Sequence, residues 1–369
     1  MGGIDYDVVI VGGGFYGCFV AYQIASRFPH HNILVLEKEN ALFTGASATN
    51  QGQLHKGYMY SIDAELAAEC GRNVVLFERH FHDAIDHGVT AYYGIHRDSE
   101  IDPAGYERFC RAQGIPLREV DGAARRYFGD EVEVVYASAE RTFHSGRLQA
   151  LMRARMDRYG VRVRTAQRVL RVAPRDGGGV TVLLADGTAI GAGTVYNTAF
   201  AGINPLHERS GLSHVPMRCE VFLHFLLGMP AEYGNVGTSV IRGYFASLLP
   251  SSFRGGHLLA AAAYRRIRAR DGLPPSEHID EYLIEKVYGE ALAGCSGYLP
   301  GLRDAAYLGH VIGTRVACID QVSGEVTSRV TPVLDFDGVP GYHVILGGKV
   351  TCLFEALEPA LRGMRATGR

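Results

Sequence analysis

Three glycines near the start of the chain have the spacing that suits binding of a dinucleotide. Gly12, Gly14 and Gly17 follow a valine-rich run and open a segment whose apolar residues recur at helical spacing. At this spacing the first glycine permits a tight turn, the second lets backbone approach a pyrophosphate, and the third lets the helix pack on the strand. The helix N-terminus, with the backbone amides of Phe15 and Tyr16, would then face the phosphates.

An acidic residue ends the next apolar run. The run NILVLE (32–37) finishes with Glu37, which is followed by Lys38. A carboxylate at this place can accept hydrogen bonds from the ribose hydroxyls of adenosine and would repel a 2′-phosphate. The pattern therefore predicts a βαβ unit in which Glu37 and Lys38 contact a dinucleotide. This unit alone does not choose between FAD and NAD.

The segment TGASATNQGQLHKGYMY (44–60) resembles the D-amino-acid-oxidase-like superfamily of flavoproteins. Hydroxyglutarate-oxidising members carry a similar GASGRNSGxxHxG stretch, which is matched by Gly45, Ala46, Ser47, Asn50, Gly52, His55 and Gly57. D-amino acid dehydrogenases carry a similar NAGQxxxGY stretch, which is matched by Asn50, Gly52, Gln53, Gly57 and Tyr58. Three positions depart from these relatives: Thr49 replaces an arginine, Gln51 a serine and Phe200 a glycine.

Two later segments extend this resemblance to the end of the chain. The stretch GTVYNTAFAG (193–202) is similar to the VVNAAGA of the superfamily. The stretch GGKVT (347–351) is similar to the GGKLT turn of FAD-linked glycerol-3-phosphate dehydrogenases. Glycine oxidases and L-2-hydroxyglutarate oxidases belong to the same superfamily, so the resemblance does not choose among these substrates.

The resemblance implies FAD as the cofactor and assigns residues to its parts. The flavin edge would be formed by Ser47, Asn50, Gln51 and Gly52. Val169 would make the backbone contact to adenine, and Thr198 and Ala199 would flank the pyrophosphate. The pyrimidine side would be formed by Gly348, Lys349, Val350 and Thr351. We expect non-covalent FAD. Monomeric sarcosine oxidases tether FAD through a cysteine in a comparable segment, which makes a link through Cys318 the alternative.

Lys349 stands between two glycines and a helix-like run, where positive charge would favour a reduced flavin. Reduced flavin is negative at N1 and at the C2 oxygen. An ammonium group, exposed glycine amides or a helix N-terminus would each stabilise that charge. The sequence places all three together at residues 347–351.

For the chemical step, His55 is the best candidate for a general base because it follows the flavin-edge loop. His310 and His343 are alternatives near other motif segments. Arg315 resembles the arginine of a G-R-P segment that commonly meets a substrate carboxylate or phosphate, although Val316 replaces the proline.

Other residues could complete the substrate pocket. Arg329 is a reserve anchor for an anion, because an arginine binds a carboxylate with two hydrogen bonds. Tyr58, Tyr60 and Tyr244 could line the pocket.

Two reactions fit these residues. The first is hydride transfer from the CH–NH carbon of a small amine or amino acid to flavin N5. The second, on the same fold, is oxidation of the CH–OH of a 2-hydroxy acid or polyol phosphate. The NQGQ stretch and the missing arginine at 49 favour the first, and His55 with GGKVT favours the second. A flavin-binding protein without turnover is a third hypothesis.

We expect an α/β fold in which a Rossmann-type FAD-binding domain is interleaved with a smaller α+β substrate domain with a mixed or antiparallel sheet. The FAD-binding domain would comprise residues 1–75, 145–205 and 305–369, and the substrate domain 76–144 and 206–304. Helical spacing recurs at 61–85, 103–113, 147–160 and 276–292, and strand-like alternation at 161–199, 220–227 and 257–267.

Composition limits the other possibilities. The 369 residues carry a net charge of −2 and 21% charged residues, which gives no basic field for nucleic acid. No apolar run reaches the roughly 18 residues that span a bilayer. The N-terminus shows no export signal, so we expect a cytoplasmic protein.

The cysteines and histidines suggest neither disulfides nor a metal. The seven cysteines are scattered without a Cys-x-x-Cys pair, and the histidine pairs lack zinc-like ligand spacing. The expected partners are a small-molecule substrate and either oxygen or another electron acceptor. The oligomeric state stays open.

Overall fold

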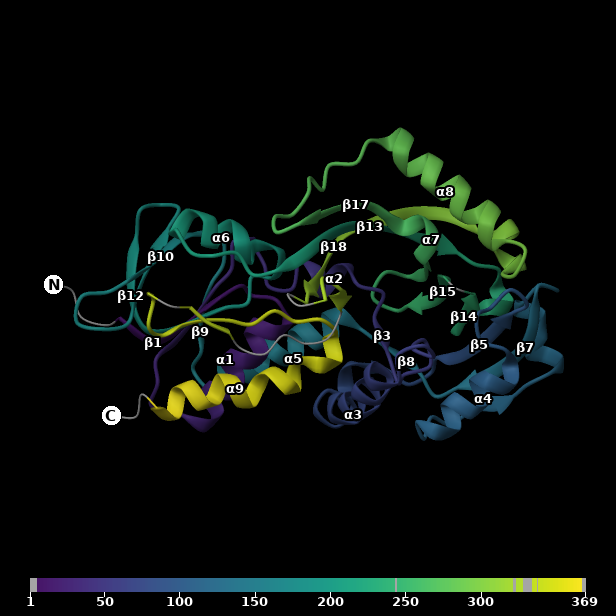
Figure 1. Ribbon diagram of the computed structural model, residues 1–369, viewed down its shortest axis with the longest axis horizontal. Helices are drawn as coiled ribbons and strands as arrows, with labels where there is room; N and C mark the ends of the chain where they lie inside the picture. The colour runs from purple at the N-terminus through teal and green to yellow at the C-terminus, as the bar shows by residue number, and fades with distance from the viewer. Residues whose placement is uncertain (1–4, 243, 321–322, 328–333, 337, 367–369) are drawn as a thin grey trace.

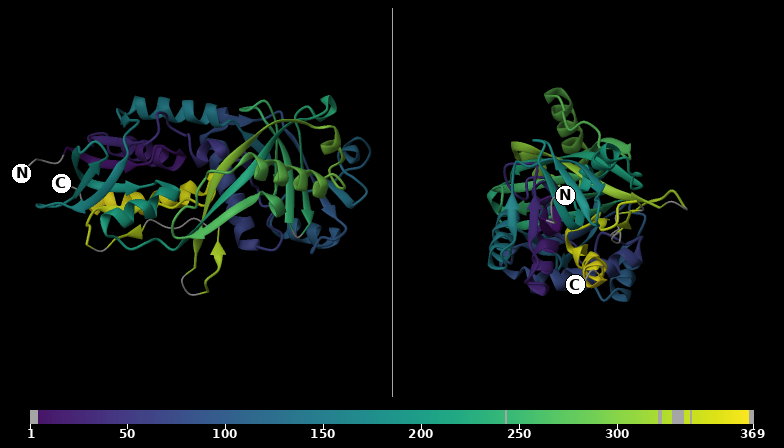
Figure 2. Two further views of the ribbon diagram at one scale, coloured as in Figure 1. Left: turned by 90° about the horizontal axis from the view of Figure 1, so that it is seen from above. Right: turned by 90° about the vertical axis from the view of Figure 1, so that its left-hand side faces the viewer.

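The computed structural model describes residues 5–242, 244–320, 323–327, 334–336 and 338–366. In this part of the chain the strands form three sheets of eight, ten and three strands, which we call the first, second and third sheets. The first and second sheets lie toward opposite ends of an elongated molecule, and strands of the third lie near its middle (Figure 1). The two views of Figure 2 show the same elongation from above and from one end.

The first sheet is parallel at its centre. Its strand order is β10-β11-β12-β1-β2-β9, with β21 paired to β12 and β20 to β21. Strand β1 runs parallel to β12 and β2, and β12 parallel to β21, whereas β10, β11 and β12 form an antiparallel meander. The strands are β1 (Tyr6–Val11), β2 (Ile33–Leu36), β9 (Arg162–Arg164), β10 (Val169–Pro174), β11 (Val180–Leu184), β12 (Ala189–Asn197), β20 (Leu334–Asp335) and β21 (Tyr342–Val344).

The valine-rich strand β1 is buried on both faces. Val8 and Ile10 pack in a cluster with helices on one side, whereas Val9 and Val11 pack in a second cluster on the other. All four are at most 6% exposed, as expected for a strand inside a parallel sheet covered by helices. The helices of the first cluster are α1 (Phe15–Arg27), α3 (Ala64–His80), α5 (Ser145–Arg158) and α9 (Leu353–Ala366), and α6 (Ile203–Ser210) belongs to the second.

The second sheet is mostly antiparallel. Its strand order is β19-β18-β13-β16-β15-β14-β5-β7-β6, with β17 paired to β13. Helix α8 (Glu281–Cys295) packs on this sheet, and α4 (Pro103–Ala112) packs near β5 and β7. The strands are β5 (Thr90–His96), β6 (Arg118–Glu119), β7 (Val132–Ser138), β13 (Met217–Gly228), β14 (Val236–Arg242), β15 (Tyr244–Ser251), β16 (Gly256–Ala261), β17 (Arg266–Asp271), β18 (Ala306–Ile319) and β19 (Val326–Thr327).

The third sheet joins the early loops to the segment before α5. Strand β8 pairs with both β3 and β4. Its strands are β3 (Gln53–Leu54), β4 (Ile85–Asp86) and β8 (Arg141–Phe143). The short helices elsewhere are α2 (Ala46–Thr49), α7 (Ala262–Arg265), η1 (His82–Ala84), η2 (Gly122–Tyr127), η3 (Phe200–Gly202), η4 (Ala231–Tyr233), η5 (Pro300–Asp304) and η6 (Val350–Cys352).

The expected fold class is confirmed, with one local correction. The predicted helices are present as α3, α4, α5 and α8, and the meander as β10, β11 and β12. The segment 257–267, expected as one strand, is interrupted by α7. Its alanine run is a good helix former, so the local propensity allows one helical turn between two strands.

The pairing of β18 bears on the domain division. The expected division placed 305–369 with the FAD-binding domain, but β18 pairs along its length with β13, from Met217↔Cys318 to Gly228↔Ala306. Strand periodicity shows that a segment is a strand, and it does not show which sheet the strand joins. We therefore propose that this domain boundary lies after residue 319.

Replacement of Gly17 by alanine should destabilise the protein. A Cβ at Gly17 would overlap the carbonyl oxygen of Gly12 and lie 2.6 Å from Thr198 Oγ1, so α1 would have to move away from the sheet. Such overpacking costs about 1 to 3 kcal/mol. We expect Gly17→Ala to lower the thermal unfolding midpoint measured by circular dichroism.

The matched control is Gly289→Ala in α8, where an added Cβ meets nothing within 4 Å. An exposed helix glycine costs up to about 1 kcal/mol relative to alanine, so this variant should keep or raise the midpoint. Equal midpoints for Gly17→Ala and the parent would show that α1 does not need this close approach.

Candidate functional site

A cavity of about 960 Å³ is lined by residues from both large sheets. It begins at the glycine turn after β1 and extends past the loop 44–55 to β13 and β18. Of the predicted cofactor residues, its lining includes Gly12, Gly14, Phe15, Tyr16, Glu37, Lys38, Ser47, Asn50, Gln51, Gly52, Val169, Thr198, Ala199, Gly348, Lys349, Val350 and Thr351. Segments far apart in the sequence therefore meet at one hollow.

At the glycine turn, atoms of Thr198 and Ser47 lie close to Gly12 and Gly14. Gly12 has a φ of +107°, and a Cβ there would lie 3.0 Å from the carbonyl oxygen of Thr198. A Cβ at Gly14 would lie 3.2 Å from Ser47 Oγ, and this oxygen also accepts a hydrogen bond from the amide of Phe15 at 2.9 Å. The turn thus leaves a cradle at the start of α1, where an anion is favoured.

Glu37 is held at the end of β2. One of its carboxylate oxygens accepts a hydrogen bond from the amide of Gly13 at 2.7 Å, and the other accepts one from the amide of Glu39 at 2.9 Å. Each oxygen has a second lone pair for a hydroxyl donor. The residue lies in the cavity wall with Lys38 and Val169, as a ribose and adenine site would require.

The opposite wall of the turn comes from the end of β12. Thr198 Oγ1 donates to the carbonyl oxygen of Val11 at 3.0 Å, which ties together the ends of the neighbouring strands β12 and β1. Phe200, which stands where many members of the superfamily have glycine, has a φ of +57° and lines the cavity. A bulky residue in this left-handed region carries backbone strain.

The loop before β3 is braced by its own side chains. Asn50 Nδ2 donates to the carbonyl oxygens of Ala46 and Ser47, and Asn50 Oδ1 accepts from the amide of Gly52 at 2.8 Å. Gln51 Nε2 donates to the carbonyl oxygen of Leu258 at 2.7 Å in the second sheet. The loop is therefore anchored both to itself and to the second sheet.

The late turn 347–351 is attached to the first helix. Tyr16 Oη donates to the carbonyl oxygen of Lys349 at 2.6 Å, and a Cβ at Gly347 would overlap the Tyr16 ring. The Lys349 ammonium lies 4.6 Å from the centre of the Tyr60 ring, which is a cation–π contact. Burial lowers the pKa of Lys349.

His55 lies in the cavity wall and is kept neutral. Burial, followed by the positive charges of Lys349 and Arg265, lowers its pKa to about 3. The ring packs against Tyr60 with centres 5.5 Å apart. In the described part of the chain, His55 Nδ1 is buried without a hydrogen-bond partner.

Two arginines line the cavity beside the second sheet. Arg315 on β18 donates to Glu220 Oε2 at 3.3 Å, and the register places Glu220 directly opposite Arg315 on β13. Arg265 in α7 lies 5.1 Å above the Phe245 ring. Burial, then repulsion by Arg315, lowers the pKa of Arg265 to about 10.

Arg265 and the adjacent His224 were not predicted from the sequence. Nη1 of Arg265 lies 3.3 Å from His224 Nε2, and both residues line the cavity. Burial, with Arg265 next, lowers the pKa of His224 well below its usual value. The segment that holds Arg265 was expected to be a plain strand, and arginines are frequent in the sequence, so no local signal marked this one.

Several predicted residues lie elsewhere. Tyr58 is fully buried against the Tyr93 ring, with centres 5.2 Å apart, and its hydroxyl donates to the carbonyl oxygen of Pro116. Tyr58 and Gly17 are not among the described residues that line the cavity. Cys318 packs against the core cluster of the first sheet and is likewise absent from the described lining. Arg329 and the side chain of Tyr244 lie outside the described residues.

The alternative histidines also lie away from the cavity. His310 is exposed and its Nδ1 pairs with the Tyr307 hydroxyl at 2.8 Å. His343 pairs with Asp335 and stacks on Tyr196. Neither is among the lining residues that the structure describes, so His55 is the predicted base that lies in the cavity.

The donor set of the cavity fits a dinucleotide flavin. The turn after β1 offers amides to phosphates, Glu37 offers acceptors to a ribose, and the late turn offers a cation. Among the described residues, Thr49, His55 and His224 line the cavity, and each has a buried polar atom without a hydrogen-bond partner: Thr49 Oγ1, His55 Nδ1 and His224 Nδ1. Buried polar atoms normally have partners, so these atoms indicate that a ligand belongs there.

The part of the chain that the structure describes holds no helix with both the length and the apolar character to cross a membrane.

Comparison with known proteins gives relatives with two kinds of substrate. The L-2-hydroxyglutarate dehydrogenase of Caenorhabditis briggsae is 32% identical over 117 residues, 31% of this chain and 27% of that protein. One component of the anaerobic glycerol-3-phosphate dehydrogenase of Escherichia coli K12 is 26% identical over 378 residues, 93% of this chain and 64% of that protein. The chain thus matches less than two thirds of the length of either relative.

A solved structure and a family model agree on the fold. Glycine oxidase from Geobacillus kaustophilus superposes with a TM-score of 0.69 at 16% identity, over 96% of this chain and 92% of that chain. The model of the DAO family, described as FAD dependent oxidoreductase, matches residues 7–350. The resemblance inferred from the motifs is confirmed, and the chain belongs to the DAO family of FAD-dependent oxidoreductases.

Proposed function

We propose that this enzyme oxidises the CH–OH carbon of a small anionic hydroxy compound, a 2-hydroxy acid or a polyol phosphate. The observation that carries this proposal is the grouping of Arg265, Arg315 and Lys349 around the neutral His55 in one cavity. The relatives named for L-2-hydroxyglutarate and glycerol 3-phosphate support it, because both named substrates are anionic alcohols. FAD, when bound, supplies the acceptor for the hydride.

The cofactor would be held along the cavity. We assign the pyrophosphate to the glycine turn at Gly12 and Gly14 and to the start of α1, with Thr198 and Ala199 on the other side. The ribose would bind Glu37, and the adenine would lie by Val169. The loop Ser47–Gly52 would border the flavin edge, and residues 348–351 its pyrimidine side.

The charges at the other end would bind the substrate. Arg315 can place two donors on a carboxylate or phosphate, and Arg265 can add a second charged contact. Arg265 is desolvated, so its attraction to an anion exceeds the value in water. Burial, and then repulsion by Arg315, lowers the pKa of Arg265, and an anion between the two arginines would relieve that repulsion.

His55 would take the hydroxyl proton. An imidazole with a lowered pKa is neutral near pH 7 and has a free lone pair for a proton. A bound anion would offset Lys349 and Arg265, whose charges help to lower this pKa, and would therefore raise the basicity of His55 when substrate is present.

Oxidation of a CH–NH bond is the second candidate. Glycine oxidase shares the fold, and the cations of the cavity would disfavour an ammonium group and so leave a bound amine neutral. The two candidates differ in the compounds that should reduce the flavin.

The first prediction concerns the substrate. The purified enzyme with FAD should lose its visible flavin absorbance anaerobically with L-2-hydroxyglutarate or glycerol 3-phosphate, and not with glycine. Bleaching by glycine alone would favour the second candidate. No bleaching by any of these compounds would contradict both and would support a flavin-binding protein without turnover.

The second prediction concerns Arg265. Loss of a charged hydrogen bond costs about 1.5 to 3 kcal/mol, so Arg265→Met should raise KM for the hydroxy compound about ten- to a hundredfold. Arg270→Met removes an exposed arginine of β17 and is the matched control. An unchanged KM in Arg265→Met would show that this guanidinium does not bind the substrate.

The third prediction concerns Lys349. Lys349→Met removes a partly buried positive charge beside the proposed pyrimidine site, so it should lower the flavin reduction potential and slow the reduction by substrate. The same change at Lys286, a half-exposed lysine on α8 paired with Glu290, should leave the potential unchanged. Equal flavin reduction potentials in both variants would indicate that the backbone amides of the turn, and not Lys349, stabilise the reduced flavin.

A further inference from the structure

A buried carboxylate lies behind the segment that carries His55. Glu140 is 2% exposed and directly precedes β8, the strand that pairs with β3. It is not among the described residues that line the cavity, although its partner Gln53 is. The proposed reaction itself makes no use of Glu140.

The contacts of Glu140 flank His55 on both sides. One oxygen, Oε1, accepts a hydrogen bond from the backbone amide of Lys56 at 2.8 Å. The other, Oε2, accepts from Gln53 Nε2 and from the Tyr93 hydroxyl, each at 2.6 Å. The carboxylate therefore binds both ends of the segment 53–56. Glu140 itself lies 84 residues after Lys56 in the chain.

Burial of the Glu140 carboxylate costs free energy unless its hydrogen-bond donors are in place. Burial raises the pKa of Glu140, whereas the hydrogen bonds from Tyr93, from the Lys56 amide and from Gln53 lower it. All three partners are donors, which suits a carboxylate that accepts through both oxygens. Removal of a partner from a buried charged group costs more than an ordinary hydrogen bond contributes.

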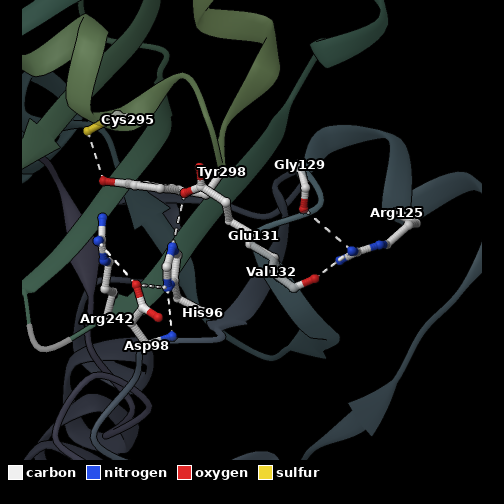
Figure 3. A network of polar contacts seen from close by, with 9 residues as sticks. All are labelled: His96, Asp98, Arg125, Gly129, Glu131, Val132, Arg242, Cys295 and Tyr298. Atoms are coloured by element: carbon white, nitrogen blue, oxygen red, sulfur yellow. Dashed lines mark hydrogen bonds and ion pairs between the residues drawn. The ribbon is translucent and has the colours of Figure 1, made fainter.

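A second histidine shows a different way to orient an imidazole (Figure 3). His96 Nε2 lies 3.0 Å from Glu131 Oε2, and its Nδ1 accepts from the amide of Asp98 at 2.9 Å. The ring is thus held by direct contacts, far in sequence from the residues of the cavity. His55 Nδ1, in contrast, has no hydrogen-bond partner among the described residues, so the direction of its ring depends on its backbone and packing.

We infer that Glu140 is a positioning residue, which holds residues 53–56 so that the His55 imidazole faces the substrate end of the cavity. This inference rests on the proposed role of His55. Glu140 acts only through the segment: it accepts hydrogen bonds and transfers no proton. Tyr93 orients the carboxylate from the second sheet, so the base is tied to the same sheet that carries Arg315.

The first test measures the segment itself. Glu140→Gln removes the negative charge of the carboxylate, and hydrogen bonds to a neutral amide are weaker than those to a carboxylate, so both holds on the segment are weakened. Hydrogen–deuterium exchange of the FAD-bound enzyme should become at least tenfold faster in the peptide spanning 50–60. The control Glu131→Gln, which removes the charge from the contact with His96, should leave that peptide unchanged. Unchanged exchange in Glu140→Gln would overturn the inference.

The second test asks whether Glu140 acts through His55. Anaerobic flavin reduction by L-2-hydroxyglutarate, or by glycerol 3-phosphate if that compound reduces the flavin instead, is measured for Glu140→Gln, His55→Gln and the double variant. Glu140→Gln should slow the limiting rate at least tenfold with less than a threefold change in the half-saturating concentration. In the His55→Gln background it should cost less than twofold, because coupled residues are not additive.

The two proposals can fail separately. Equal slowing in both backgrounds would overturn the inference and leave the role of His55 intact. If His55→Gln reduces as fast as the parent, the proposed base is wrong, and the positioning role falls with it. The exchange experiment would then still show whether Glu140 holds the segment.

Discussion

The close approach of α1 to the first sheet is the constraint on which the rest of the site depends. Gly17 permits it, because any side chain there would meet the carbonyl oxygen of Gly12 and the hydroxyl of Thr198. The same helix holds the late turn through Tyr16 and Lys349. Helix α1 thus brings the glycine turn after β1 and Lys349 to the same cavity. The chain between them forms most of the second sheet.

Three positively charged side chains gather in the cavity. Lys349, Arg265 and Arg315 lie in one hollow, and the carboxylate of Glu220 balances Arg315 from the neighbouring strand. Desolvation and mutual repulsion lower the pKa of Lys349, of Arg265 and of His55. Burial is the largest cause of each shift, and an anionic substrate placed among these cations would favour their charged forms.

The candidate site could be predicted where the chemistry is local. The turn at Gly12, the acid at Glu37 and the turn at Lys349 each follow a strand and precede a helix or loop, so the pattern itself places them in the cavity. Tyr58 shows the limit of this reasoning. It belongs to a matching motif, yet its ring packs in a core of tyrosines, and Tyr60, two residues later, meets the cavity instead.

By itself, the sequence determined the fold class, the dinucleotide turn, the family and the cofactor, because glycine spacing, strand hydrophobicity and short motifs are local properties of the chain. Only the tertiary structure decided that β18 joins β13, that Arg265 faces His224 and that Glu140 holds the segment of His55. These are contacts between residues far apart in the chain. Sequence periodicity specifies which face of an element is buried, and it leaves open which distant element covers that face.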